Sequence, residues 1–218
     1  KPLFLITYEW PSLALLSLWI PAGIFLIWAF FIPRLIPAAL IVAGLIALIT
    51  SSMGWQQNLG TAAKCWDPDD FGKYSDLIVR WLDEPESREV IELYLDSWRY
   101  SWLPLTPFLL TIQQLVGIPY INAYFHIVVL SGFGSLLFFH AILGRVFKLE
   151  ARWAYLGSLL FVFHHFILKA YAKPSNDALA LMLVLGMLFL LGLRFTEATR
   201  RNTIWLSVLV ILHLLARP

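Results

Sequence analysis

Long stretches without a charged side chain are the feature of this sequence that most limits its fold. Residues 11–32 form a run of 22 without a charge, and residues 35–53 form a run of 19 more. About 20 apolar residues cross the hydrocarbon core of a bilayer as a helix, so each run has the length of a membrane span. Pro33 lies between them and ends the first helix, which leaves room only for a tight helical hairpin.

Four further apolar runs follow later in the chain, at residues 121–143, 153–168, 178–193 and 202–216. The first of them has 23 residues, with only His126 and His140 as titratable interruptions. A hydrogen-bonded, buried histidine is the common form of such a residue in a span. The three shorter runs reach membrane length with interfacial residues at their ends, such as Trp153 and Tyr155 at the level of the headgroups. The sequence therefore predicts an all-α integral membrane protein with about six transmembrane helices.

The composition agrees with this class. Of the 218 residues, 60% are hydrophobic and only 14% are charged, and the mean hydropathy is +0.74. An ordinary soluble domain cannot carry that composition on its surface. The net charge of +2 is distributed by loop instead of forming one basic face, so it gives no sign of nucleic-acid binding.

The charged loops predict the orientation of the helices. Residues 144–152 and residues 194–201 are rich in Arg and Lys, and with Arg34 they fall on one side if every run crosses once. By the positive-inside rule this side is the cytoplasm. The long polar segment and the loop at residues 169–177 then lie outside the cytoplasmic, or inner, membrane.

The outer segment, residues 54–103, is strongly acidic. It has five basic and ten acidic residues, so its net charge is 5 − 10 = −5. Its apolar residues recur at helical spacing on both sides of Pro85, which predicts two amphipathic helices on the membrane surface. A third, at residues 104–116, is too short to span and ends near Gly117; if it did cross, the later topology would invert.

Three regions are therefore expected. Residues 1–53 form an amino-terminal hairpin of two spans, residues 54–120 form the outer acidic loop with two or three juxtamembrane helices, and residues 121–218 form a transmembrane helix bundle. The chain begins at Lys1 without a Met and stops directly after an apolar run. We expect a fragment of a longer polypeptide whose bundle is incomplete at its carboxyl end.

Three carboxylates open the outer segment: Asp67, Asp69 and Asp70. They can serve a helix terminus, with Asp67 as the N-cap, Pro68 as the first helical residue and the other two in the first turn. They can also serve chemistry, since a carboxylate at the outer mouth of a bundle can take a proton from an attacking hydroxyl. Asp69 and Asp70 together offer the oxygen ligands that Mg or Mn prefers.

The order of these features resembles a known family. A span is followed by Asp69-Asp70 and, after three more residues, Tyr74, then by surface helices, a Pro-rich stretch at residues 102–107 and a string of further spans. From residue 35 onward the chain looks like the amino-terminal module of the GT-C glycosyltransferases. It is most similar to the polyprenyl-phosphate-sugar-dependent transferases related to protein mannosyltransferases and to the aminoarabinose transferases of lipid A.

This resemblance implies a sugar donor on a polyprenyl phosphate and an inverting transfer outside the cytoplasm. An acidic residue of the first outer loop would act as base or metal ligand, which falls on Asp69 or Asp70, with Tyr74 as the matching aromatic that contacts substrate. The sequence differs from the family by the extra span at residues 11–32.

A donor phosphate needs positive charge on the same outer surface. Lys173 is the first candidate and Lys169 the second, because a lysine can meet a phosphate as a point charge. His165 lies nearby and is a candidate for substrate binding. The alternatives are a snorkelling role for Lys169 and anchoring near the headgroups for His165.

A second class of function is open. The chain can be a non-catalytic membrane subunit that packs in a larger membrane complex, which its 10 Trp and 16 Phe would suit. The sequence has a single cysteine, Cys65, so no multi-cysteine metal site is possible. No cofactor other than a possible Mg or Mn is indicated.

Overall fold

The computed structural model describes residues 19–61, 79, 105–118, 120–171, 177–196 and 199–216. Within these ranges the chain is helical and contains no strand. The all-α fold class is therefore confirmed for the described part of the chain. Most of the acidic segment, from residue 62 to residue 103 with the exception of Val79, lies outside the described residues.

In the described part of the predicted amino-terminal hairpin, two helices flank Pro33. A helix at Trp19–Phe31 is joined to α2 (Ile36–Thr61) by a single turn of 3₁₀-helix, η1 (Pro33–Leu35). The Leu35 amide donates to the Ile32 carbonyl at 2.9 Å, and Pro33 occupies the start of the turn, where its missing amide costs nothing. Helix α2 runs eight residues beyond the predicted end at residue 53, since it continues to Thr61.

The rest of the described chain is a series of helices with short connections. They are α6 (Leu105–Leu115), α7 (Tyr120–Ala141), the π-helical turn η3 (Ile142–Val146), α8 (Ala151–Val162), α9 (His165–Tyr171), α10 (Asp177–Thr196) and α11 (Arg200–Ala216). Helix α6 ends where expected, because Gly117 adopts a positive φ of 84° that reverses the chain. The bounds of α7, α10 and α11 agree with the predicted runs to within four residues.

The run at residues 153–168 departs from the prediction, because it is two helices and not one. Helix α8 stops at Val162, and the His164 carbonyl then accepts the Ile167 and Leu168 amides, which starts α9. Neither Pro nor Gly lies at the break. Periodicity and breaker residues therefore could not have located it.

In the part of the chain that the structure describes, three helical segments are long and apolar enough to cross a membrane: Pro33–Thr50, Phe125–Val146 and Asp177–Thr196. The Trp19–Phe31 helix is apolar but shorter. The three long segments account for half of the six predicted spans.

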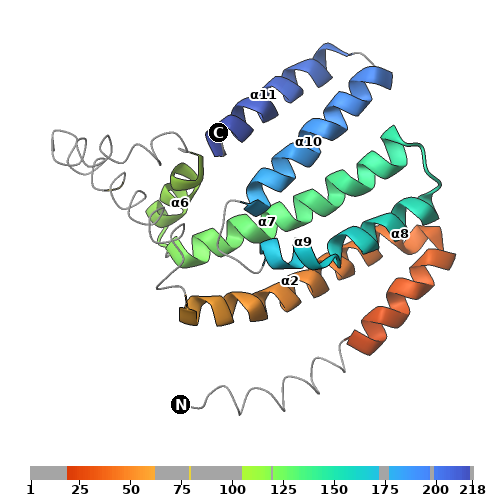
Figure 1. Ribbon diagram of the computed structural model, residues 1–218, viewed down its shortest axis with the longest axis horizontal. Coiled ribbons are helices and arrows are strands. Elements are labelled where there is room, and N and C mark those ends of the chain that lie inside the picture. The colour runs from red at the N-terminus through yellow and green to blue at the C-terminus, as the bar shows by residue number, and fades with distance from the viewer. Residues whose placement is uncertain are drawn as a thin grey trace.

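Helix α7 lies in the middle of the bundle (Figure 1). It packs against α10 on one side and against α8 and α2 on the other, while α11 lies outside α10 and contacts it. Gly134 of α7 allows close approach of the two helices, because a Cβ at this position would overlap the Met182 side chain of α10.

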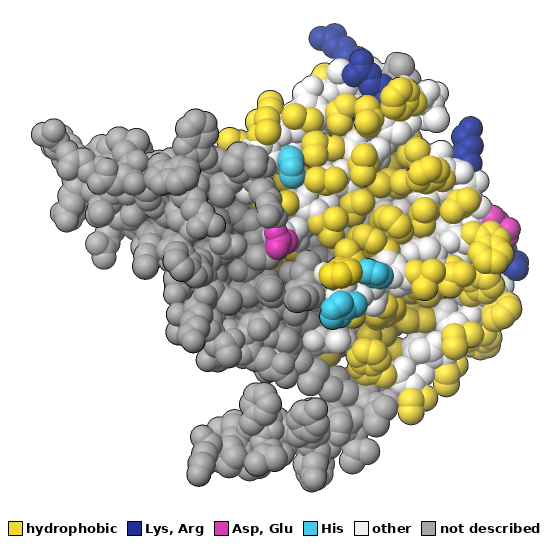
Figure 2. All heavy atoms as spheres, in the orientation of Figure 1, with side chains coloured by type: hydrophobic (Ala, Val, Ile, Leu, Met, Phe, Trp, Pro, Cys, Tyr) yellow, Lys and Arg dark blue, Asp and Glu magenta, His cyan; other side chains and the backbone are white. Residues whose placement is uncertain are grey.

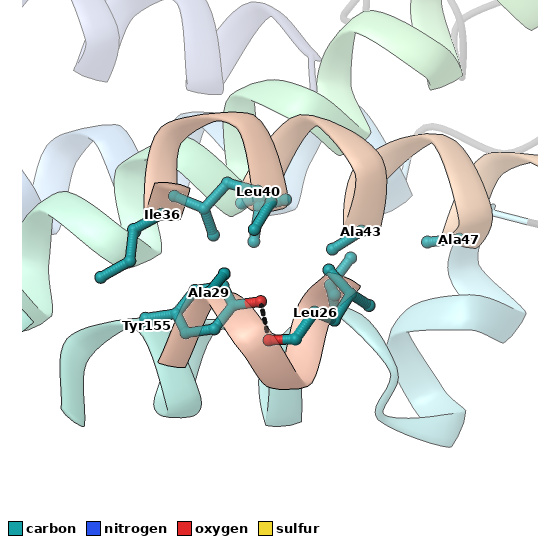
Figure 3. Packing of buried hydrophobic residues seen from close by; sticks show 10 residues of the cluster. Leu26, Ala29, Ile36, Leu40, Ala43, Ala47 and Tyr155 are labelled. Carbon is teal, nitrogen blue, oxygen red and sulfur yellow. Dashed lines mark hydrogen bonds between the residues drawn. The ribbon is translucent and has the colours of Figure 1, made fainter. Parts of the chain in front are cut away.

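Two hydrophobic cores lie on the two sides of α7. The first, which we call the α2 core, is built from Leu26, Ala29, Ile36, Ala39, Leu40, Ala43, Ala47, Leu136, Tyr155 and Val162. Figure 3 shows α2 lying across the Trp19–Phe31 helix, with Tyr155 of α8 reaching between them. The second, the α10 core, is built from Leu110, Ala123, Ile127, Val128, Ala178, Leu179, Leu183 and Ala216.

Tyr155 corrects one prediction. It was expected among the headgroups, but its ring is completely buried in the α2 core and its hydroxyl donates to the Leu26 carbonyl at 2.9 Å. A buried tyrosine needs a partner for its hydroxyl, and the hairpin backbone supplies it. Trp153, two residues earlier, does stay exposed, as expected.

Candidate functional site

The Lys and Arg side chains that the structure describes gather at one end of the bundle, which we call the basic end. They belong to η1, to the η3–α8 connection with its flanking turns, to the end of α10 and to the start of α11: Arg34, Arg145, Lys148, Arg152, Arg194, Arg200 and Arg201. Figure 2 shows the dark blue side chains along the upper and right-hand edges of the molecule. All of them are exposed. The basic loops predicted from the sequence thus lie together at one end of the described bundle.

Close packing joins the helices at the basic end. The Phe30 and Trp153 rings meet edge to face with centroids 5.9 Å apart, which ties the hairpin to α8. Gly192 of α10 lies so near Val146 of η3 that a Cβ there would be 2.6 Å from it. The basic side chains are therefore carried by helix ends that touch one another.

The opposite end of the bundle, which we call the far end, is where the helices that precede the predicted site residues come to an end. Helix α2 finishes there, α9 lies beside α2, and α10 begins there. Leu168 of α9 packs against the α2 core, and Ala178 and Ala216 meet in the α10 core. The segment that follows α2 and the segment that follows α9 thus leave the bundle at the same end.

The predicted catalytic, metal-binding and substrate-binding residues of the acidic segment lie outside the described residues; these are Asp67, Asp69, Asp70 and Tyr74. Lys173 also lies outside them. The backbone of Lys169 belongs to α9, and its side chain is not among those described. No distance between these carboxylates and lysines follows from the structure, and their roles stay predictions.

His165 is the one predicted site residue whose side chain is described. It is the first residue of α9 and is exposed, and its ring centroid lies 5.5 Å from that of Phe166. His164 is exposed beside it and lies 5.6 Å from the same ring. Both imidazoles are exposed at the break between α8 and α9, about two turns before α9 ends.

Two hydrogen bonds link α6 and α7 near the far end. His126 Nδ1 lies 2.9 Å from Gln113 Oε1, and because an amide oxygen only accepts, the imidazole is the donor. The Gln113 amide in turn donates to the Ala123 carbonyl at 3.3 Å. His126 is hydrogen-bonded as expected, but it is exposed and not buried.

His140 fits its prediction more closely. It is partly buried between α7 and α8, with Nδ1 3.0 Å from Ser158 Oγ. The Ser158 hydroxyl donates to the Ala154 carbonyl at 2.7 Å, so the imidazole is the donor to Ser158. The sequence contained the histidine signal but no feature that identified Ser158 or Gln113 as the partner.

Among the described side chains, no group of three or more His, Cys, Asp and Glu residues is placed to hold a metal ion. Two buried polar atoms, Ser135 Oγ and His213 Nδ1, have no hydrogen-bond partner in the described part of the chain. They lie on α7 and α11, and no other titratable group is shown to converge on either.

Comparison of the chain with protein-family models, with curated proteins and with solved structures finds no match. We therefore infer the function from the arrangement of the chain itself.

Proposed function

We propose that the chain is a membrane-embedded helix bundle with its basic end in the cytoplasm and its far end outside. Its six crossings would be the Trp19–Phe31 helix, α2, α7, α8 with α9, α10 and α11. Support comes from the three segments long and apolar enough to span and from the gathering of those Lys and Arg side chains that the structure describes at a single end. A bundle that exposes large apolar residues on α2, α7 and α10 suits a lipid environment.

We propose further that this bundle is a GT-C-like glycosyltransferase, which transfers a sugar from a polyprenyl-phosphate donor to an acceptor on the outer face of the inner membrane. The observation that carries the proposal is the contact between α2 and α9. The acidic segment follows α2, and Lys173 follows α9. Both segments therefore start from the same end of the bundle, as a shared substrate requires.

The reaction assigns a role to each predicted residue. Asp69 or Asp70 takes the proton of the acceptor hydroxyl as its oxygen attacks the anomeric carbon, and the bond from that carbon to the phosphate oxygen breaks. The polyprenyl phosphate leaves with the bonding electrons, and Lys173, with Lys169, offsets its negative charge. Asp67 supports this acidic cluster, and Tyr74 and His165 contact the sugar.

The test is a transfer assay with the full chain in membranes. The donors are undecaprenyl-phosphate mannose and undecaprenyl-phosphate aminoarabinose, and the readout is labelled sugar moved to endogenous acceptors. D69N/D70N should reduce transfer by a factor on the order of 10² to 10⁴, the usual contribution of a general base. Glu150→Gln is the matched control, because it also removes a carboxylate, but at the basic end, where Glu150 lies 3.7 Å from Arg152.

Full transfer by the double variant would remove the enzyme proposal. Wild-type protein that inserts, binds neither donor and transfers nothing would instead favour the non-catalytic subunit. Site-directed labelling of single cysteines at residues 34 and 177, after Cys65→Ser, tests the orientation separately, because residue 177 is exposed at the start of α10. We expect reagent from outside to reach residue 177 and not residue 34.

A further inference from the structure

The turn between α10 and α11 concentrates positive charge at the basic end. Arg194 is in the last turn of α10, and Arg200 and Arg201 are the first two residues of α11. All three are exposed. Over the basic loops as a whole, the sequence has seven basic residues (34, 145, 148, 152, 194, 200 and 201) and two acids (150 and 197), so the net charge is 7 − 2 = +5.

Two of these arginines are placed against the helix dipole. Arg200 and Arg201 lie in the first turn of α11, which contains no acidic residue, and the positive end of the dipole repels cations there. Thr199 Oγ1 accepts the Asn202 amide at 3.2 Å and satisfies only one of the free amides of this turn. An anion at this position would be attracted by the arginines and by the helix terminus together.

Apolar side chains adjoin this charge. Phe195 follows Arg194 and is 85% exposed, and Trp205 lies one turn beyond Arg201 on α11 and is 53% exposed. Tryptophan is typical of the boundary between headgroups and hydrocarbon. A ligand that satisfies both features has an anionic head and an apolar tail, whereas a free phosphate would use only the arginines.

We propose that the basic α10–α11 turn binds the headgroup of an anionic phospholipid. The phosphate lies against Arg194, Arg200 and Arg201, and the acyl chains lie along Phe195 and Trp205. The same end contains an internal comparison. Arg152 also begins a helix, α8, but Glu150 lies 3.7 Å from it and offsets its charge, whereas no carboxylate among the described residues is paired with the arginines of α11.

The experiment titrates the purified full chain in neutral detergent with dioleoyl phosphatidylglycerol or with dioleoyl phosphatidylcholine. Native mass spectrometry counts the bound lipids. We expect phosphatidylglycerol to be preferred, by a factor of about five for each basic side chain near the headgroup. R194Q/R200Q/R201Q should then reduce its affinity on the order of 100-fold at low salt, and less at 0.15 M salt, where charges are screened beyond about 8 Å.

Three variants localise the effect. The corresponding Arg→Lys triple variant should keep the preference, because a lipid phosphate at a membrane surface needs charge more than geometry. Trp205→Ala should weaken the binding of both lipids equally, since it removes an apolar contact. Arg152→Gln should leave the preference within about twofold of wild type, because that charge is already offset.

The proposal is overturned if the Gln triple variant keeps its preference for phosphatidylglycerol while circular dichroism shows intact helices. It is also overturned if Arg152→Gln reduces the preference as much as the triple variant does. Displacement of phosphatidylglycerol by inorganic phosphate at equal concentration would show a site for free phosphate and would contradict the proposed lipid site.

Discussion

The two hydrophobic cores on either side of α7 are built differently. In the α2 core, Ile36, Ala39, Ala43 and Ala47 form one stripe along the first half of α2, where the small residues let the neighbouring helices approach. The α10 core is concentrated at the far end, where Leu110 of the short helix α6 meets the ends of α7, α10 and α11. One core is an extended seam between long helices, and the other is closed by a helix too short to span.

The two cores therefore contribute differently to the stability of the bundle. Lipid gives helices little hydrophobic reason to associate, so the extended seam depends on small residues and close packing. In the far-end core the polar groups gather on the short helix, with Thr106 and Thr111 buried in α6 and the Gln113–His126 pair beside them. We infer that the α2 core holds the scaffold together, while the short helix α6 is the element that opens most easily at the far end.

The largest expected effect tests how α6 is held. Leu110→Ala removes the completely buried side chain that anchors α6, and a cavity of this kind typically costs about 2–5 kcal/mol. Because α6 packs mainly on α7 and α11, hydrogen exchange should lose protection in α6 first. Leu136→Ala, in the α2 core, should lower protection across α2, α7 and α8 together. Leu115→Ala, where the side chain is 58% exposed, should change stability by less than about 0.5 kcal/mol. Equal loss of protection in α6 for all three variants would refute the separation of the two cores.

Two glycines at the contacts of α7 with α2 and with α10 should have a smaller effect on stability. A Cβ at Gly44 would lie 2.5 Å from the Phe133 ring, which is planar and packed, so Gly44→Ala should destabilise the protein by about 1–3 kcal/mol. At Gly134 the obstacle is the flexible Met182 side chain, which can move aside, and the cost should be under about 1 kcal/mol. Thermal unfolding in detergent measures both.

Gly23→Ala is the matched control for these substitutions. No atom lies within 4 Å of a Cβ at Gly23, so the same change should stabilise the Trp19–Phe31 helix by up to about 1 kcal/mol. A uniform response at the three glycines would mean that helix propensity, and not the packing of the seams, decides these positions.

The sequence predicted the parts of the fold that charge and proline mark. Pro33 and Arg34 located the hairpin, and the uncharged runs located α7, α10 and α11, because a long stretch of apolar residues between charged ones favours one continuous helix. The end of α2 was missed, since the polar residues after Met53 resemble a loop although the helix continues to Thr61. The break between α8 and α9 was missed because backbone hydrogen bonding at His164, and no Pro or Gly, produces it.

The candidate site was less predictable than the fold. Carboxylates and lysines were chosen by type and by side of the membrane, and those criteria contain no distances. Asp69, Asp70 and Lys173 lie outside the described residues, so the geometry that would decide their roles stays a prediction. Tyr155 was misplaced for a similar reason, because the amphipathic ring that suits a headgroup region also suits a core in which a backbone carbonyl lies within reach of its hydroxyl.

The smallest expected effect compares the polar links of the two cores. Tyr155→Phe and His126→Phe each keep an aromatic ring and remove one hydrogen bond between elements, to the Leu26 carbonyl and to Gln113 respectively. Tyr155 is completely buried, so its bond has no competition from water, and its loss should cost about 1 kcal/mol. His126 is exposed, so solvent can replace its bond and the loss should be about 0.5 kcal/mol or less. Thermal unfolding of both variants, with the double variant to test additivity, measures the difference. A larger cost at His126 would reverse the assignment, because the far end would then contribute more to holding the bundle together than the buried seam does.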